Sequence, residues 1–251
     1  MQEINIAVIV PVMAPEVAND WAYVQSCLNR TLGSILANSY VTRIHVICQS
    51  RPDDMIEDDR IKFLEAENEI PKQGDRDARM NDKGSKLLQG IRAASNDHPN
   101  YVMFVDADDI ISRSLFDCVV NEPGYDAYCI NRGYEWFEGA QTMMEIPHFH
   151  KYCGSTFILK FSKDIFPNWL GDRSQASRVA DQSHTGIEQS LRDQQFKIKY
   201  INSPLVIYVS GGADQYRSRG KRLRRRLLDF LSSPLRKRKI NQQMRHEFLM
   251  D

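Results

Sequence analysis

The stretch YVMFVDADD, residues 101–109, decides both the fold and the chemistry that this sequence predicts. Its first five residues are apolar or aromatic, which is typical of a buried strand. The strand ends in three aspartates within four residues, Asp106, Asp108 and Asp109. Like charges this close repel one another, and a bound Mg²⁺ or Mn²⁺, which prefers hard oxygen ligands, would relieve the repulsion. The alternative is a solvated strand end in which Asp108 or Asp109 caps the following turn.

Strand-like and helix-like segments alternate ahead of this stretch. Short β-branched runs predict strands at residues 6–12, 44–48 and 61–64. Helical spacing of apolar residues after the N-cap Asp20 predicts a first helix, and residues 83–94 predict a second after a long polar connection over 67–82. This order predicts an α/β fold with a mostly parallel sheet and helices on both faces. In such sheets, ligands bind beyond the carboxyl ends of the strands, where the acidic cluster lies.

The second half of the chain mixes shorter elements. Helices are expected at residues 114–120 and 183–195, around an aromatic-rich stretch at 134–137. Further strands are expected at residues 126–130, 155–161, 197–201 and 205–209.

Several of these segments resemble family-2-type glycosyltransferases with the GT-A fold. YVMFVDADDIISRSLF (101–116) is similar to their DxD segment, and IAVIVPV (6–12) to their first, nucleotide-binding strand. KGSKLLQGIRAA (83–94) resembles the helix beside the donor site, GSTFILKFSKDIF (154–166) the acceptor-side strand, and FKIKYINSPLVIYV (196–209) the closing strands. The resemblance implies a single Rossmann-like GT-A domain over residues 1–212. The composition changes at this point, which predicts a basic helical tail over 213–251.

The same resemblance implies metal-dependent transfer of a sugar, by inversion, from a UDP-, GDP- or dTDP-sugar to a hydroxyl of a glycan or glycolipid. Asp108 would be the direct ligand of Mn²⁺ or Mg²⁺, and Asp106 would face the ribose or a metal-bound water. Asp109 would be either a carboxylate that supports these two without touching the metal or one on the acceptor side. Expected donor contacts are Pro11, Gln49, Asp53, Arg79, Lys83 and Asp106.

Inverting enzymes need a base for the acceptor proton. This family usually supplies it from a paired Glu-Asp, which is absent from the matching window DQSHTGIE (181–188). Asp181 and Glu188 are the carboxylate candidates, and His184 is a candidate base or third metal ligand. Each of the three has the alternative of being a surface helix residue.

Two further clusters have more than one interpretation. His148, His150 and Cys153 are expected on one strand, where they would bind zinc or form an aromatic wall of an acceptor pocket. Four aromatic residues either stack on sugar rings or belong to the core, and these are Tyr134, Trp136, Phe137 and Trp169.

The net charge of zero hides an asymmetry. Residues 217–251 hold 12 basic and 3 acidic residues, whereas the first 216 residues hold 21 basic and 30 acidic ones. Leucines near one face of 217–239, surrounded by arginines, predict a basic amphipathic helix that binds an anionic membrane surface. The alternatives are packing on the acidic body and, less favoured because no recognition motif accompanies it, nucleic acid. Five scattered cysteines and the lack of a long apolar run favour the cytoplasm, with attachment at the inner face of the membrane.

Three other functions compete with glycosyl transfer. A nucleotidyltransferase would use the same carboxylates, but it is expected to have a Gly-rich cationic loop, and VMAPEV (12–17) contains neither glycine nor a cation. A phosphatase with a nucleophilic Asp normally places it on the first strand. The third alternative is a GT-A domain without activity that binds a partner through its tail.

Overall fold

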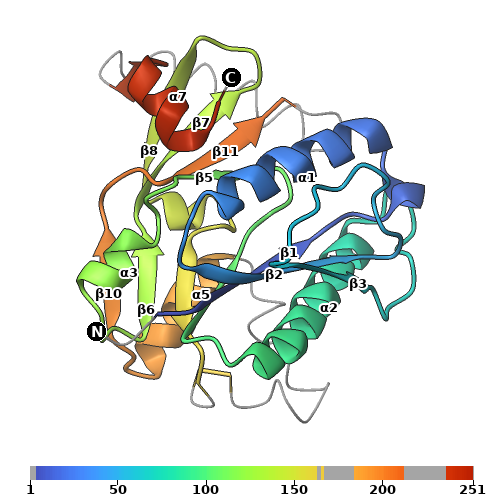
Figure 1. The fold of residues 1–251 in the computed structure, drawn as a ribbon, viewed down its shortest axis with the longest axis horizontal. Helices are drawn as coiled ribbons and strands as arrows, with labels where there is room; N and C mark the ends of the chain where they lie inside the picture. Colours follow the sequence, from blue (N-terminus) through green and yellow to red (C-terminus); the bar gives the residue numbers. More distant parts are fainter. Residues whose placement is uncertain (1–3, 163–164, 167–183, 212–235, 251) are drawn as a thin grey trace.

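The computed structural model describes residues 4–162, 165–166, 184–211 and 236–250, and its larger sheet has seven strands (Figure 1). The strand order is β10-β6-β9-β4-β1-β2-β3, and only β9 runs antiparallel to its neighbours. The strands are β1 (Ile6–Pro11), β2 (Val41–Cys48), β3 (Ile61–Glu65), β4 (Tyr101–Phe104), β6 (Ala127–Ile130), β9 (Phe157–Lys160) and β10 (Ile198–Ile201).

Two long helices cover opposite faces of this sheet, α1 (Trp21–Leu36) and α2 (Arg76–Ala94) (Figure 1). Alternate residues of β1 point to opposite faces, so Val8 and Val10 belong to the α1 side of the core and Ile9 to the α2 side. The helix α1 begins as expected, because the Asp20 carboxylate accepts a hydrogen bond from the Tyr23 N–H at 3.0 Å. The predicted α/β class, a mostly parallel sheet between helices, is confirmed.

A second sheet, of which the sequence patterns predicted only the strand at residues 205–209, has the strand order β12-β8-β7-β11-β5. Its strands are β5 (Ile110–Ile111), β7 (Arg132–Phe137), β8 (Thr142–Pro147), β11 (Val206–Ser210) and β12 (Lys237–Lys239). Because β5 begins directly after the aspartates, residues 105–109 join the two sheets. Val105 N–H donates to Ile9 O at 3.0 Å on one side, and β5 pairs with β11 on the other.

Short helices complete the described chain. They are η1 (Pro15–Val17), η2 (Ser95–Asp97), α3 (Asp117–Asn121), η3 (Phe149–Lys151), α5 (His184–Asp193) and α7 (Gln242–Phe248). The prediction that a helix begins at residue 114 was wrong by three residues. Ser114 instead lies in a turn in which its N–H donates to Ser112 Oγ at 3.0 Å.

The predicted start of the second helix was also wrong. Residues 76–82 are the first two turns of α2 and not part of a connection, because Asp75 caps the helix by accepting from Ala78 N–H at 3.0 Å. The polarity of these residues concealed the helix, since few of them face an apolar core. The earlier start places Arg79, Lys83 and Lys86 on successive turns of one helix.

Residues 148–153 do not form a strand, which corrects the expectation for the two histidines. His148 has a left-handed φ of 51°, and a 3₁₀ turn follows it. His148 is exposed and His150 is buried, so the two do not share a strand face. Among the described side chains, no group of three or more His, Cys, Asp or Glu is placed to bind one metal ion, and a zinc site at these residues is therefore not supported.

The end of the basic tail packs on the body. Lys237–Lys239 form a strand against β8, not the end of an amphipathic helix, and Arg238 pairs with Glu145 at 2.9 Å. On α7, Glu247 accepts from Ser112 and Ser114, and Phe248 is buried. Residues 217–235 of the predicted membrane helix lie outside the described residues, so membrane binding stays a prediction. Within the described ranges, no helix is long and apolar enough to cross a membrane.

Candidate active site

A cavity of about 430 Å³ lies beyond the carboxyl ends of β1 and β4. Ligand-binding pockets commonly fall in this size range and at this edge of an α/β sheet. It is lined by the end of β1, the N-terminal turns of α1 and of α2, the acidic segment after β4 and the turn after η3, together with Val17 and Pro71. Tyr208 of β11 adds the smaller sheet to the wall.

The three aspartates take different positions at this cavity. Asp106 and Asp108 line it, whereas Asp109 is fully buried behind them. The Asp109 Oδ2 atom accepts from Ser155 Oγ at 2.5 Å and from Cys153 Sγ at 3.0 Å. Burial, with the nearby charges of Asp108 and Asp106, raises the pKa of Asp109 well above its usual value. Asp109 is therefore part of the supporting structure, and ligand contact falls to the other two.

The N-terminal half of α2 makes one wall cationic. Arg76, Arg79 and Lys83 line the cavity on this side, and the Lys83 ammonium forms an ion pair with Asp106 Oδ1. Burial opposes the charged form of Lys83, but the carboxylates around it prevail and raise its pKa. Arg79 donates to Val17 O at 2.9 Å, which holds its guanidinium at the loop after β1. Positive charge at the N-terminus of a helix favours a bound anion.

A buried polar network supports this wall. Lys86 Nζ donates at 2.7 Å both to Asp82 Oδ2 and to Val12 O, and its side chain is 1% exposed. Asp82 Oδ1 accepts from Gln49 Nε2 at 2.8 Å and from Asn68 Nδ2 at 2.7 Å. Sequence reasoning missed Lys86 and Asn68. An earlier helix start would have revealed the i,i+4 spacing of Asp82 and Lys86.

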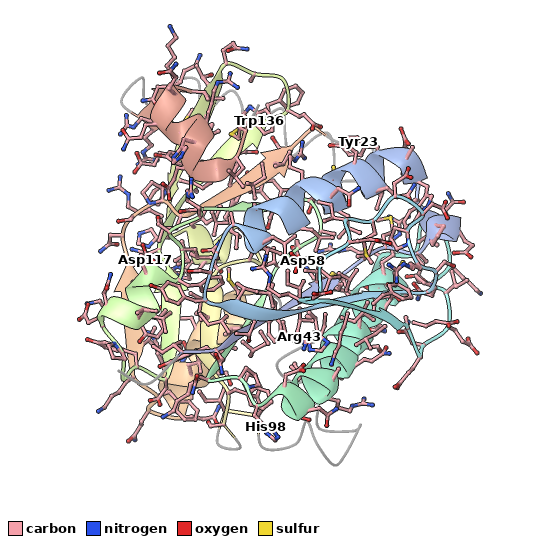
Figure 2. The ribbon with its side chains drawn as sticks, in the orientation of Figure 1. Tyr23, Arg43, Asp58, His98, Asp117 and Trp136 are labelled. Carbon is pink, nitrogen blue, oxygen red and sulfur yellow. The ribbon has the colours of Figure 1, made fainter. Side chains whose placement is uncertain are left out.

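The wall on the α1 side is aromatic. Tyr23 of α1, Tyr152 and Tyr208 line it, and the rings of Tyr152 and Tyr208 meet edge to face with centroids 5.3 Å apart. Tyr23 OH donates to Glu138 Oε2 at 2.6 Å, so its ring is fixed between α1 and the turn after β7. Figure 2 labels Tyr23 and Trp136 on the α1 side of the larger sheet. The cavity therefore has one cationic wall and one aromatic wall.

The aromatic residues that the sequence singled out are not the ones that line the cavity. Tyr134, Trp136 and Phe137 lie on β7, outside the lining residues. Trp136 Nε1 donates to Ala140 O at 2.9 Å, and the Cζ atom of Arg30 lies over the Trp136 ring, 5.7 Å from its centroid. These three residues belong to the smaller sheet, and Trp169 lies outside the described residues.

Most of the expected donor residues meet at the cavity. Pro11, Arg79, Lys83 and Asp106 line it, together with the expected metal ligand Asp108. Gln49 does not line the cavity itself, but its side-chain amide donates to the lining residue Asp82. Asp53 does not line the cavity; it is exposed, and its N–H donates to Gln25 Oε1 at 2.8 Å.

None of the three candidate bases is placed at the cavity by the part of the chain that the structure describes. Asp181 is outside the described residues, and His184 begins α5 with its side chain undescribed. Glu188 is on α5 but does not line the cavity. Its role as a base stays a prediction.

The carboxylates at the cavity fit a cation that takes its other ligands from the substrate. Asp106 and Asp108 are two hard oxygen donors, and magnesium usually reaches proteins through one or two carboxylates plus substrate phosphates. A third ligand is not supplied by the described His, Cys, Asp or Glu side chains. Lys83 forms an ion pair with one oxygen of Asp106, so a cation held by Asp106 would compete with this ammonium.

Comparison with known proteins finds likeness in solved structures. No family model matches the sequence, and no curated protein matches it. The structure is similar to residues 1–349 of Staphylococcus aureus TarS (12% identity, TM-score 0.48), covering 82% of this chain and 60% of that one. It is similar to the 4-diphosphocytidyl-2C-methyl-D-erythritol synthase of Anaerococcus prevotii (12% identity, TM-score 0.49), covering 90% and 96%. The Francisella tularensis 2-C-methyl-D-erythritol 4-phosphate cytidylyltransferase gives 9% identity and a TM-score of 0.48, covering 90% and 99%.

Proposed function

We propose that the protein transfers a sugar from a nucleoside-diphosphate sugar to a hydroxyl of a glycan or glycolipid acceptor. The observation that carries the proposal is that Asp106 and Asp108 line the same cavity as Arg76, Arg79 and Lys83. A diphosphate needs both kinds of residue, since cations bind it directly and carboxylates bind it through a divalent metal.

Each wall has a part in this reaction. The acceptor oxygen attacks the anomeric carbon and gives its proton to a general base, while the bond from that carbon to the diphosphate oxygen breaks and negative charge grows on the departing nucleoside diphosphate. Lys83 and the arginines of α2 face that charge, and fixed charges aimed at a developing anion lower the barrier. Mn²⁺ or Mg²⁺, when bound through Asp108, supplies further Lewis-acid stabilisation. Tyr23, Tyr152 and Tyr208 offer ring faces and edges to the sugar or the acceptor.

The proposal is tested by following the turnover of UDP-, GDP- and dTDP-sugars with and without Mn²⁺. Asp108→Asn keeps the shape of the side chain and removes its charge, and we expect at least a hundredfold loss of turnover. Asp59→Asn is the matched control, because Asp59 is exposed, lies two residues before the start of β3 and does not line the cavity. Full activity in Asp108→Asn, or no binding of any of the three donors, would refute the proposal.

A nucleotidyltransferase is the competing outcome of the same experiment. It would release pyrophosphate from a nucleoside triphosphate in the presence of a sugar phosphate, and it would leave nucleotide sugars intact. The 3₁₀ turn η1, which follows β1 without any glycine, argues against a phosphate-binding loop at this position.

A further inference from the structure

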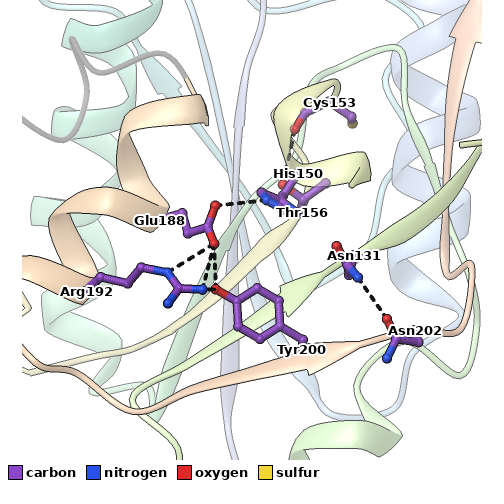
Figure 3. Close-up of polar contacts among 8 residues, drawn as sticks. All are labelled: Asn131, His150, Cys153, Thr156, Glu188, Arg192, Tyr200 and Asn202. Atoms are coloured by element: carbon purple, nitrogen blue, oxygen red, sulfur yellow. Dashed lines mark hydrogen bonds and ion pairs between the residues drawn. The ribbon is translucent and has the colours of Figure 1, made fainter. Parts of the chain in front are cut away.

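Glu188 lies at the centre of a polar network on α5 that is separate from the cavity lining (Figure 3). Its Oε1 accepts from Tyr200 OH at 2.6 Å and from Arg192 Nη2 at 3.1 Å, and its Oε2 lies 3.0 Å from His150 Nε2. Burial opposes ionisation, but the hydrogen bonds from Tyr200 and Arg192 prevail and lower the pKa of Glu188. Both carboxylate oxygens are thus engaged away from the cavity, which is a poor arrangement for a base.

The partner of Glu188, His150, belongs to a short turn that leads to the cavity. His150 is 2% exposed and lies within η3. After η3 the N–H groups of Tyr152 and Cys153 both donate to Phe149 O, at 2.8 and 3.0 Å, so the turn is internally bonded. Thr156 Oγ1 then donates to Cys153 O at 3.1 Å, as Figure 3 shows. A displacement at His150 would therefore be passed on to residues 152–154, which line the cavity.

The far end of this turn is bonded to the acidic segment. Cys153 and Ser155 both donate to Asp109, and Ser155 Oγ also accepts from the Asp106 N–H at 2.8 Å. Gly154 lies so close to Asp106 that a Cβ added to it would be 3.0 Å from Asp106 Oδ2. The position of the turn therefore determines the space available to the Asp106 carboxylate.

We propose that Glu188 is a positioning residue that holds the turn of residues 149–155 against Asp106 and thereby sets the affinity for the donor diphosphate. The identity of the ligand in this proposal rests on the proposed function. The connection from Glu188 through residues 149–155 to Asp106 does not depend on it. The proposal assigns Glu188 to a different role from that of base, and Asp181 and His184 remain the candidates for the acceptor proton.

Cys153 provides a readout of the connection that needs no ligand. It is 2% exposed at the cavity wall, and its thiol donates to Asp109. We would treat the full chain with N-ethylmaleimide under native conditions and quantify labelling of each cysteine by peptide mass spectrometry. Glu188→Ala should raise the labelling rate of Cys153 about tenfold, and Glu188→Gln, which keeps one acceptor oxygen, should raise it less. Cys48, fully buried on β2, is the internal reference for global unfolding.

The control variant is Glu122→Gln, which removes a comparable charge from an exposed glutamate that pairs with Lys199 at 2.8 Å. It should leave the labelling of Cys153 unchanged. If Cys153 in Glu188→Ala stays protected, or if Cys48 becomes reactive in parallel, the connection is overturned.

The second measurement is calorimetric titration with UDP, GDP and dTDP in the presence of MnCl₂. For the nucleotide that binds best, Glu188→Ala should weaken binding about tenfold and Glu188→Gln should partly restore it, while the pH profile of turnover keeps its shape. Loss of turnover in Glu188→Gln by a thousandfold, with unchanged nucleotide affinity, is the behaviour of a base and would overturn the proposal. If none of the nucleotides binds wild-type protein, the proposed function fails, and the labelling of Cys153 alone decides whether Glu188 holds the turn.

Discussion

The buried ion pair between Lys86 and Asp82 gives the sharpest test of how the cationic wall is built. The two side chains are 1% and 9% exposed, and Lys86 also donates to Val12 O. Removing one member of a buried pair leaves an uncompensated charge, which costs about 3–5 kcal/mol. In Lys86→Met the side chain keeps nearly the same length, so little cavity is created. Asp82 keeps its bonds from Gln49 and Asn68, and we therefore expect about 3 kcal/mol, at the low end of the range.

The assay is urea unfolding at pH 7, followed by tryptophan fluorescence. Asp82→Asn should lower the free energy of unfolding by a similar amount. It leaves the Lys86 ammonium buried without a counter-charge, with only the Val12 carbonyl and the new side-chain amide oxygen as neutral acceptors. The double variant removes both charges, so its cost should be less than the sum of the two single costs, with a coupling of about 1–3 kcal/mol. Lys62→Met is the matched control: Lys62 is 49% exposed and pairs with Asp97 at 3.3 Å, so its cost should stay below about 0.5 kcal/mol. A cost below about 1 kcal/mol for Lys86→Met, or additive costs in the double variant, would refute the reasoning.

Three further predictions concern packing, the site and pH. Gly90→Ala places a Cβ 2.5 Å from Ile9 Cγ2 and should cost about 1–3 kcal/mol in urea unfolding, whereas a cost near zero would show that α2 moves freely on the sheet. Gly154→Ala should weaken nucleotide binding about tenfold in calorimetry while changing the free energy of unfolding by less than about 1 kcal/mol; unchanged affinity would contradict the close approach to Asp106. Burial lowers the pKa of His45 and His150 despite their carboxylate partners, so the unfolded chain binds more protons below its histidine pKa. The free energy of unfolding should therefore fall as the pH drops below about 6.5, and His150→Gln should reduce that slope; an equal slope in the variant would exclude His150 as a contributor.

The sequence predicted the larger sheet well because its strands follow simple rules. The runs around Val8, Ile47 and Val102 are buried on both faces and therefore almost continuously apolar. Of the smaller sheet, only β11 was expected, because its run at residues 205–209 is apolar. The other strands were missed because they alternate or carry charge, as in Thr142–Pro147 and Lys237–Lys239, and such strands become recognisable only through their partners. Tertiary pairing, which local patterns do not encode, decided these elements.

The site was predictable to a similar degree. Asp106, Asp108, Arg79 and Lys83 were found because charge at a strand end or a helix start is visible in sequence. Tyr152 and Tyr208 were missed because each looks like an ordinary core aromatic residue until β11 and the turn after η3 meet. That Glu188 lies away from the cavity could not be foreseen either, since its partner His150 is 38 residues away in the chain.

The acidic segment joins the two sheets, so its geometry depends on the thermal stability of both. Residues 105–109 are fixed to the larger sheet by Val105 and to the smaller one through β5, which has only two residues. Fluctuations that loosen the smaller sheet are therefore felt at the carboxylates while the larger core is still intact. We therefore expect ligand binding to be lost some degrees below the main melting transition.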